Sequence, residues 1–145
     1  MTTVEGYGRD QLRLAYADAW RKHRSREPLT ALEALIAEVI ALHPEYQPLL
    51  EDPDAALAFE TAAGGAENPF FHMGLHLAVR EQAAIDRPPG IRELRGLLLA
   101  QFGDPHRAEH VLAEALAETL WEAQRAGRAP DERHYLERAR RCLKA

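Results

Sequence analysis

Cysteine is almost absent from this sequence. The 145 residues include one cysteine, Cys142, so no disulfide can form within the chain. A reducing compartment, the cytoplasm, is therefore the expected location. The apolar residues around Cys142 recur at helical spacing, which favours a small core residue over a nucleophile.

Long hydrophobic runs and an excess of basic charge are absent as well. No apolar run approaches the roughly 18 residues of a membrane-spanning helix, and the first residues lack the apolar core of a signal peptide, so no membrane partner is expected. The formal net charge of -5 argues against nucleic acid as an obligatory partner, because phosphate binding uses clustered Lys and Arg. The sequence contains no Gly-rich phosphate loop and no signal for a nucleotide or for pyridoxal phosphate.

Helical periodicity extends along most of the chain. Hydrophobic residues make up 46% of it, as is typical of a globular protein, and their spacing predicts helices and almost no strands. Six segments carry this pattern between start and stop signals: 9–22, 30–43, 69–85, 91–102, 104–127 and 131–145. The sequence therefore predicts an all-α fold, a five- to six-helix bundle that forms a single domain over residues 1–145.

Residues 44–67 are less regular. Three prolines interrupt this segment, residues 55–61 have the composition of a short helix, and Gly64-Gly65 is expected to form a flexible corner. The strongest start signal of the chain follows directly. Asn68 is a good N-cap and Pro69 a good first helical residue, so a helix is expected to begin there.

Two histidines lie on one face of that helix. His72 and His76 are four residues apart and share a stripe with Val79. The flanking positions are apolar nearly all round, which is typical of a buried helix. We therefore expect both imidazoles to face protein rather than water.

A second group of candidate ligands lies near the start of helix 104–127. His106 and His110 border its apolar arc. Glu109 lies within that arc, where a carboxylate is costly to bury unless a cation, a donor or a metal meets it. Glu114 projects toward the more polar margin.

Helix direction predicts that these groups converge. If consecutive helices run antiparallel, helices 69–85 and 104–127 run parallel and begin at the same end of the bundle. Helix 30–43 ends there too, and its last residue, His43, falls in line with the apolar residues of its inner face. Five inward histidines and Glu109 are then expected at one level.

Convergent imidazoles with a carboxylate are a ligand set that Zn, Fe and Mn accept. We predict one or two such ions. An open coordination position would support metal-assisted hydrolysis or redox chemistry, and the sequence neither chooses between them nor decides whether the protein is an enzyme. The candidate ligands are His72, His76 and His110 in the first place, completed by His106, His43 and Glu109 or Glu114.

Two other interpretations stay open. Paired core histidines also occur where imidazoles make buried hydrogen bonds. The protein is then a non-enzymatic interaction or self-association module, which uses an exposed face near Trp20 or Trp121 to hold a protein partner or to form a homodimer. The third interpretation is a small-molecule pocket at the histidine end without a metal.

Sequence motifs occur over nearly the full length of the chain: HPEY at 43–46, NPFFHMGLHLAVREQ at 68–82, DRP at 86–88 and ETLWEAQR at 118–125. Together they resemble a family of small bacterial proteins, mainly proteobacterial, that is catalogued as a domain of unknown function. The central block follows the pattern NPFxHMxLHLAxREQ. Gln47 departs from the family, in which a further histidine is expected after the tyrosine. The resemblance implies a bacterial cytosolic protein and supplies no activity, cofactor or catalytic residue.

Overall fold

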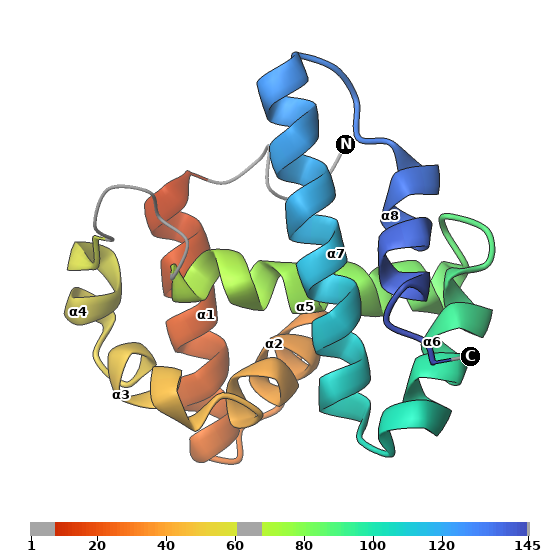
Figure 1. Ribbon diagram of the computed structural model, residues 1–145. Coiled ribbons are helices and arrows are strands. Elements are labelled where there is room, and N and C mark those ends of the chain that lie inside the picture. Colours follow the sequence, from red (N-terminus) through yellow and green to blue (C-terminus); the bar gives the residue numbers. More distant parts are fainter. Residues whose placement is uncertain (1–7, 61–67, 145) are drawn as a thin grey trace. The chain divides into compact units, whose positions relative to one another are not determined.

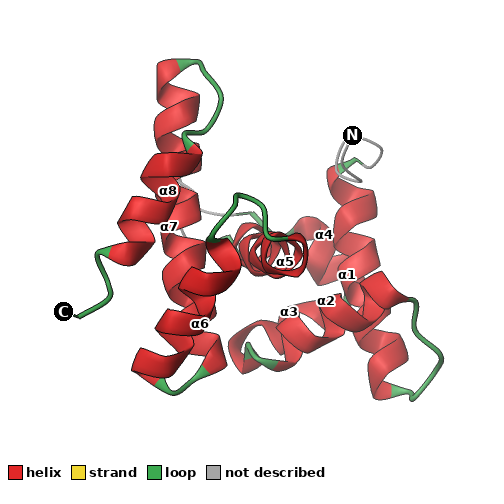
Figure 2. Ribbon diagram, turned by 90° about the vertical axis from the view of Figure 1, so that its right-hand side faces the viewer, coloured by secondary structure: helices red, strands yellow, loops and turns green. Residues whose placement is uncertain are grey.

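The computed structural model describes residues 8–60 and 68–144, which form helices joined by short loops, with no strand among them (Figures 1 and 2). The predicted all-α fold class is confirmed. The helices are α1 (Arg9–Arg24), α2 (Ala31–Ala41), the 3-10 turn η2 (Pro44–Tyr46), α3 (Gln47–Leu50), α4 (Pro53–Ala58), α5 (Pro69–Ile85), α6 (Ile91–Phe102), α7 (Pro105–Ala126) and α8 (Glu132–Arg140). The chain divides into two compact units, residues 1–73 and 74–145, so the boundary falls inside α5. The prediction of a single domain stays a prediction.

The described residues contain eight α-helices, so the predicted number of five to six was too low. The two additional helices, α3 and α4, lie in the less regular segment 44–67, where α4 overlaps the short helix expected over 55–61. Its prolines begin helices rather than interrupt them, because proline fits the first turn, where its missing N–H is not needed. Pro53 opens α4, and the Oδ1 atom of Asp52 accepts a hydrogen bond from the Asp54 amide at 3.0 Å. Gly64-Gly65 and the end of the predicted helix 55–61 lie outside the described residues.

In the first unit, α1 packs against α2, α3 and α4. One charged side chain lies in this packing: Arg13 is 5% exposed. Its Nη1 atom donates to the carbonyl oxygens of Ala56 at 3.0 Å and Phe59 at 2.7 Å, at the end of α4. These bonds satisfy carbonyls that have no partner within the short helix. The apolar core of the unit comprises Tyr16, Ala17, Ala19, Trp20, Ile36, Ala37, Val39, Ile40, Leu50, Ala56, Phe70 and Met73.

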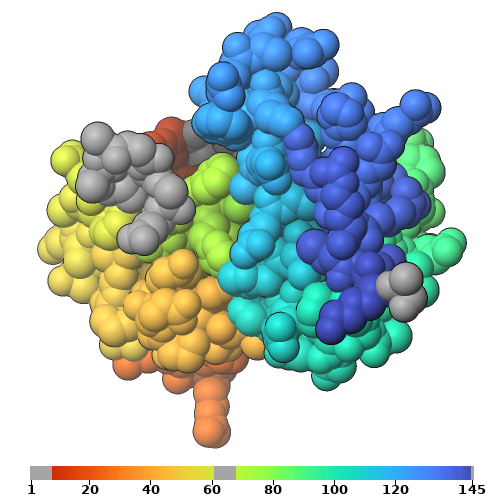
Figure 3. Space-filling view, viewed as in Figure 1, coloured from red at the N-terminus to blue at the C-terminus, as the bar shows by residue number. Residues whose placement is uncertain are grey.

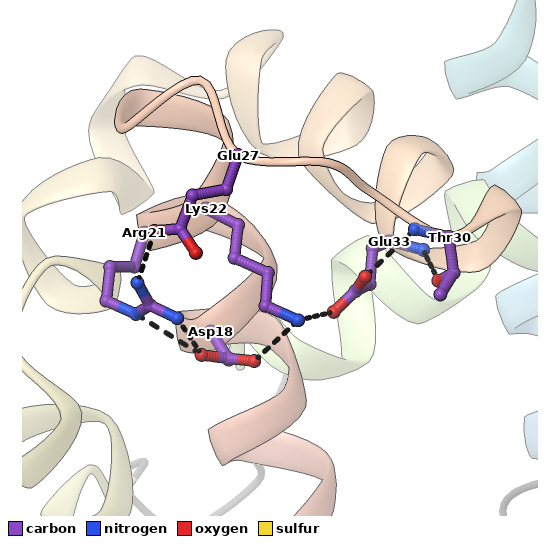
Figure 4. Close-up of polar contacts among 6 residues, drawn as sticks. All are labelled: Asp18, Arg21, Lys22, Glu27, Thr30 and Glu33. Atoms are coloured by element: carbon purple, nitrogen blue, oxygen red, sulfur yellow. Dashed lines mark hydrogen bonds and ion pairs between the residues drawn. The ribbon is translucent and has the colours of Figure 1, made fainter.

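The connection from α1 to α2 is held by a chain of polar contacts (Figure 4). Thr30 and Glu33 form a capping box, in which the Glu33 amide donates to Thr30 Oγ1 at 3.1 Å and the Thr30 amide donates to Glu33 Oε1 at 2.9 Å. Lys22 donates to the other oxygen of Glu33 at 2.9 Å and lies 3.5 Å from Asp18. The predicted N-terminus of α2 is therefore confirmed, and it is tied to the last turns of α1.

In the second unit, the later turns of α5 pack with α6, α7 and α8 around one apolar core. Gly103 ends α6 with φ 68° and Asp104 caps α7, so the chain reverses within two residues. Figures 1 and 2 show α7 crossing the second-unit part of α5 steeply. The predicted parallel alignment of these two helices is therefore wrong. The core comprises Leu75, Val79, Ile91, Leu94, Leu98, Ala108, Leu112, Ala113, Ala115, Leu116, Tyr135 and Ala139.

The C-terminal helix is shorter than predicted, because α8 ends at Arg140. Cys142 follows that end and is exposed, so its interpretation as a core residue was wrong. Among the described residues, no helix combines the length and the apolar character needed to cross a membrane.

Candidate metal centre

The α5 helix places His76 in the core of the second unit. The helix begins as predicted, with Asn68 Oδ1 accepting the amide of Phe70 at 2.9 Å and Pro69 as the first helical residue. His76 lies two turns further on and is fully buried, at 0% exposure. Such burial requires the polar ring atoms to have partners within the protein.

The first two turns of α7 supply the neighbours of His76. Asp104 caps this helix by accepting the amide of His106 at 3.0 Å, as its position before Pro105 predicts. His106 and His110 are half-buried, and Glu109 is 2% exposed. The inward position predicted for Glu109 is therefore confirmed.

Three imidazoles meet in this unit. The ring centroid of His76 lies 5.2 Å from that of His106 and 5.0 Å from that of His110, and the last two lie 4.9 Å apart. Each ring offers a nitrogen within 4.8 Å of the others. A tetrahedral ion with bonds of about 2.0–2.1 Å to imidazole places its ligand nitrogens roughly 3.4 Å apart. The three nitrogens therefore lie close enough together to be candidate ligands of one ion.

A carboxylate and a guanidinium adjoin this cluster. The Nδ1 atom of His76 lies 2.7 Å from Oε1 of Glu109. The Nε atom of Arg80 donates to both oxygens of the same carboxylate, at 3.2 and 3.0 Å. Burial acts to raise the pKa of Glu109, but the hydrogen bond from His76 and the charge of Arg80 outweigh it and lower that pKa below its ordinary value. Glu109 is therefore ionised at neutral pH although it is buried.

Glu114 is not part of this arrangement. Its side chain is 80% exposed, and its Oε1 atom lies 4.0 Å from Nδ1 of His110, one turn before it on α7. That separation is too long for a hydrogen bond. The assignment of Glu114 as a ligand stays a prediction.

The first unit has its own histidine pair. His43 is buried, and its Nδ1 atom donates to the Val39 carbonyl oxygen at 2.7 Å. Its ring stacks on Tyr46 at 5.2 Å, and the ring of His72 approaches edge-on at 5.0 Å. The inward orientation predicted for His43 is confirmed, whereas the roles of His43 and His72 as metal ligands stay predictions.

Sequence reasoning missed Arg80 altogether. The available signal was its position one turn after His76 on a helix that is otherwise apolar nearly all round. A guanidinium on that stripe requires an acid on the facing helix, and Glu109, within the apolar arc of α7, was the matching candidate.

The chain belongs to the family described as a domain of unknown function, DUF1841, which matches residues 8–141. No curated protein and no solved structure was found to match it. The family carries no activity that could be transferred, so the functional argument depends on the residues of the site.

Proposed function

We propose that the second unit binds one transition-metal ion through His76, His106 and His110. The observation that carries this proposal is the approach of three imidazole nitrogens to within 4.8 Å of one another, on two helices that meet in one core. The ion is expected from the Zn, Fe or Mn class, of which imidazole suits Zn and Fe best, and not from Mg or Ca, which prefer oxygen ligands.

Three protein ligands leave at least one coordination position for water or a substrate. Closed structural zinc sites have four protein ligands, whereas catalytic sites have three and an open position. An ion in this site would lower the pKa of a bound water or polarise a bound carbonyl or phosphoryl group. The ligand set is thus of the kind that metal-assisted hydrolysis or redox chemistry requires.

Metal analysis of untagged protein tests this proposal. We expect close to one equivalent of Zn, Fe or Mn per chain, and a melting temperature that falls when a chelator removes the ion and recovers when the ion is restored. His76→Ala, His106→Ala and His110→Ala should each abolish stoichiometric binding.

His134→Ala is the matched control. His134 lies on α8 and is 57% exposed, 3.8 Å from the Asp131 carboxylate, so its removal should leave the metal content unchanged. Wild-type protein that contains no stoichiometric metal and shows no metal-dependent melting shift would contradict the proposal.

A second candidate function is self-association through the end of α7. Trp121 is 56% exposed there, with the guanidinium of Arg125 4.5 Å from its ring centroid, and Figure 3 shows the last turns of α7 extending beyond α8 as a protrusion. Exposed tryptophan and arginine are enriched at binding hot spots. Trp20, the alternative named for such a face, is only 6% exposed, so the proposal is made for Trp121. Sedimentation of wild-type and Trp121→Gln protein at several concentrations distinguishes a dimer that depends on Trp121 from a monomer.

A further inference from the structure

We propose that Glu109 is a positioning residue that acts on the metal through His76, and that Arg80 holds it in this role. This inference rests on the proposed metal site and deepens it. Glu109 is then not a ligand of the ion, as the sequence suggests, but forms a hydrogen bond to one of the ligands.

The hydrogen-bond network determines which nitrogen of His76 carries the proton. Arg80 can only donate hydrogen bonds, and it donates to both oxygens of Glu109, so that group is an acceptor as a carboxylate. At 2.7 Å from Oε1, the Nδ1 atom of His76 must then be the donor. A neutral imidazole that is protonated on Nδ1 has its lone pair on Nε2, and this is the form that binds a metal.

The same contacts keep the carboxylate away from the ion. Oε1 of Glu109 accepts from both His76 and Arg80, and Oε2 accepts from Arg80. A direct Glu109–metal bond would break these hydrogen bonds in a site where the Glu109 side chain is 3% exposed and has little access to water as a substitute. The carboxylate therefore orients His76 and raises its basicity, as hydrogen-bonded carboxylates do for metal-binding histidines in general.

The role of Glu109 also determines the chemistry of the ligand set. With Glu109 in this role, the protein ligands are three neutral nitrogens, and the charge of the nearby carboxylate is balanced by Arg80. An all-imidazole set favours Zn²⁺ and Fe²⁺ over Mn²⁺, which prefers carboxylate oxygens.

Zinc affinity, measured by competition with a chelator, tests the role of Glu109. Glu109→Gln should weaken zinc binding about 10- to 100-fold, the range seen when a partner of a metal-binding histidine is removed. X-ray absorption should give the same number of Zn–N contacts in the variant and the wild type. Glu114→Gln is the matched control on the same helix and should change the affinity less than about twofold, because Glu114 is exposed and makes no hydrogen bond to His110.

Arg80→Met provides a second variant if Glu109→Gln fails to fold. It leaves Glu109 in place without the two Arg80 hydrogen bonds that fix it, so zinc binding should also weaken with the Zn–N contacts unchanged. If X-ray absorption shows an oxygen ligand in the wild type that is lost in a Glu109 variant, Glu109 binds the ion directly. That result would overturn the inference and leave the proposed metal binding intact. An unchanged zinc affinity in both folded variants would overturn it too.

A readout without metal separates this inference from the proposed function. Nitrogen-15 NMR of the imidazoles in metal-free protein should show that the neutral form of His76 carries its proton on Nδ1. A neutral His76 that carries its proton on Nε2 would overturn the inference whether or not the protein binds metal. Absence of zinc binding by the wild type would overturn the proposed function, and the NMR result would then decide the orientation of His76 by itself.

Discussion

The Nε atom of Arg80 lies 3.0 Å from Oε2 of Glu109, and this ion pair joins α5 to α7 within the second unit. The guanidinium side chain is 20% exposed and the carboxylate only 3%. The two charges thus differ in their access to water, and the carboxylate depends on its protein partners. Removal of Arg80 and removal of Glu109 therefore have different consequences for the fold.

Arg80→Met should destabilise the second unit, because it leaves a buried carboxylate without its cation. Loss of one partner from a buried pair costs about 3 kcal/mol. Urea unfolding, followed by circular dichroism, measures the change. The double variant Arg80→Met with Glu109→Leu should recover most of the loss, because it removes both charges together. A double variant as unstable as Arg80→Met alone would contradict the ion-pair explanation.

Arg13→Met should destabilise the first unit. The variant removes the side-chain donor of the buried Ala56 carbonyl and one of the two side-chain donors of the Phe59 carbonyl at the end of α4, and the expected loss is about 2 kcal/mol. Arg9→Met is the matched control, since Arg9 also donates to Phe59, at 2.9 Å, but from an exposed position. Its effect should stay within about 0.5 kcal/mol. Equal losses in the two variants would show that burial of Arg13 is not the cause.

Tyr16 should make the first unit sensitive to alkali. The side chain is 3% exposed, and burial raises the pKa of its phenol from 10.0 to about 12. Above pH 10 the unfolded chain releases this proton while the folded chain keeps it, so the free energy of unfolding falls as the pH rises from 10 to 12. The total is about 2–3 kcal/mol at 1.4 kcal/mol per pKa unit.

The absorbance of tyrosinate and urea unfolding at pH 8, 10 and 11.5 measure the two sides of this linkage. Tyr16→Phe should flatten the pH dependence of the first unit. Burial raises the pKa of Tyr135 in the second unit as well, so some alkaline sensitivity should remain in the variant. A Tyr16 phenol that titrates near 10 in folded protein would refute the prediction.

The capping box of α2 should contribute stability that is lost in acid. Hydrogen bonds from the Thr30 amide and from Lys22 lower the pKa of Glu33. Its contribution is therefore complete at neutral pH, and it is lost as the pH falls through the lowered pKa of the folded state. Glu33→Gln should be less stable than wild type at pH 7, and the difference should shrink on acidification. Thr30→Ala should cost about 1 kcal/mol at pH 7, and a cost that is absent at pH 7 would contradict the capping role.

The long helices could be predicted because their signals are local. Asn68-Pro69, Asp104-Pro105 and the Thr30 capping box each satisfy backbone donors within one turn, and all three begin a helix as expected. The helix α3 was missed because four residues are too few to establish a period, whereas α4 overlaps the short helix expected over 55–61 and differs from it in its bounds. Their prolines were read as breaks, although proline also begins helices.

The site could be predicted in part. Helical projection identifies the face that a side chain occupies, and it placed His76 and Glu109 inward, as their burial confirms. It does not determine the angle at which two helices cross, because that angle depends on how side chains of both helices fit together. The direct contact between His76 and Glu109 and the guanidinium of Arg80 beside them therefore required the structure.

The cap of α7 has a kinetic consequence for an ion held by its first turns. The Asp104 side chain fixes the His106 amide at 3.0 Å, and helix ends open locally far more easily than the core does. Release of the ion would begin when the first turn of α7 opens, while His76 stays in place in the core. Bound metal would in turn slow the hydrogen exchange of the amides in that turn, so their exchange rates report occupancy of the centre without a spectroscopic probe on the ion.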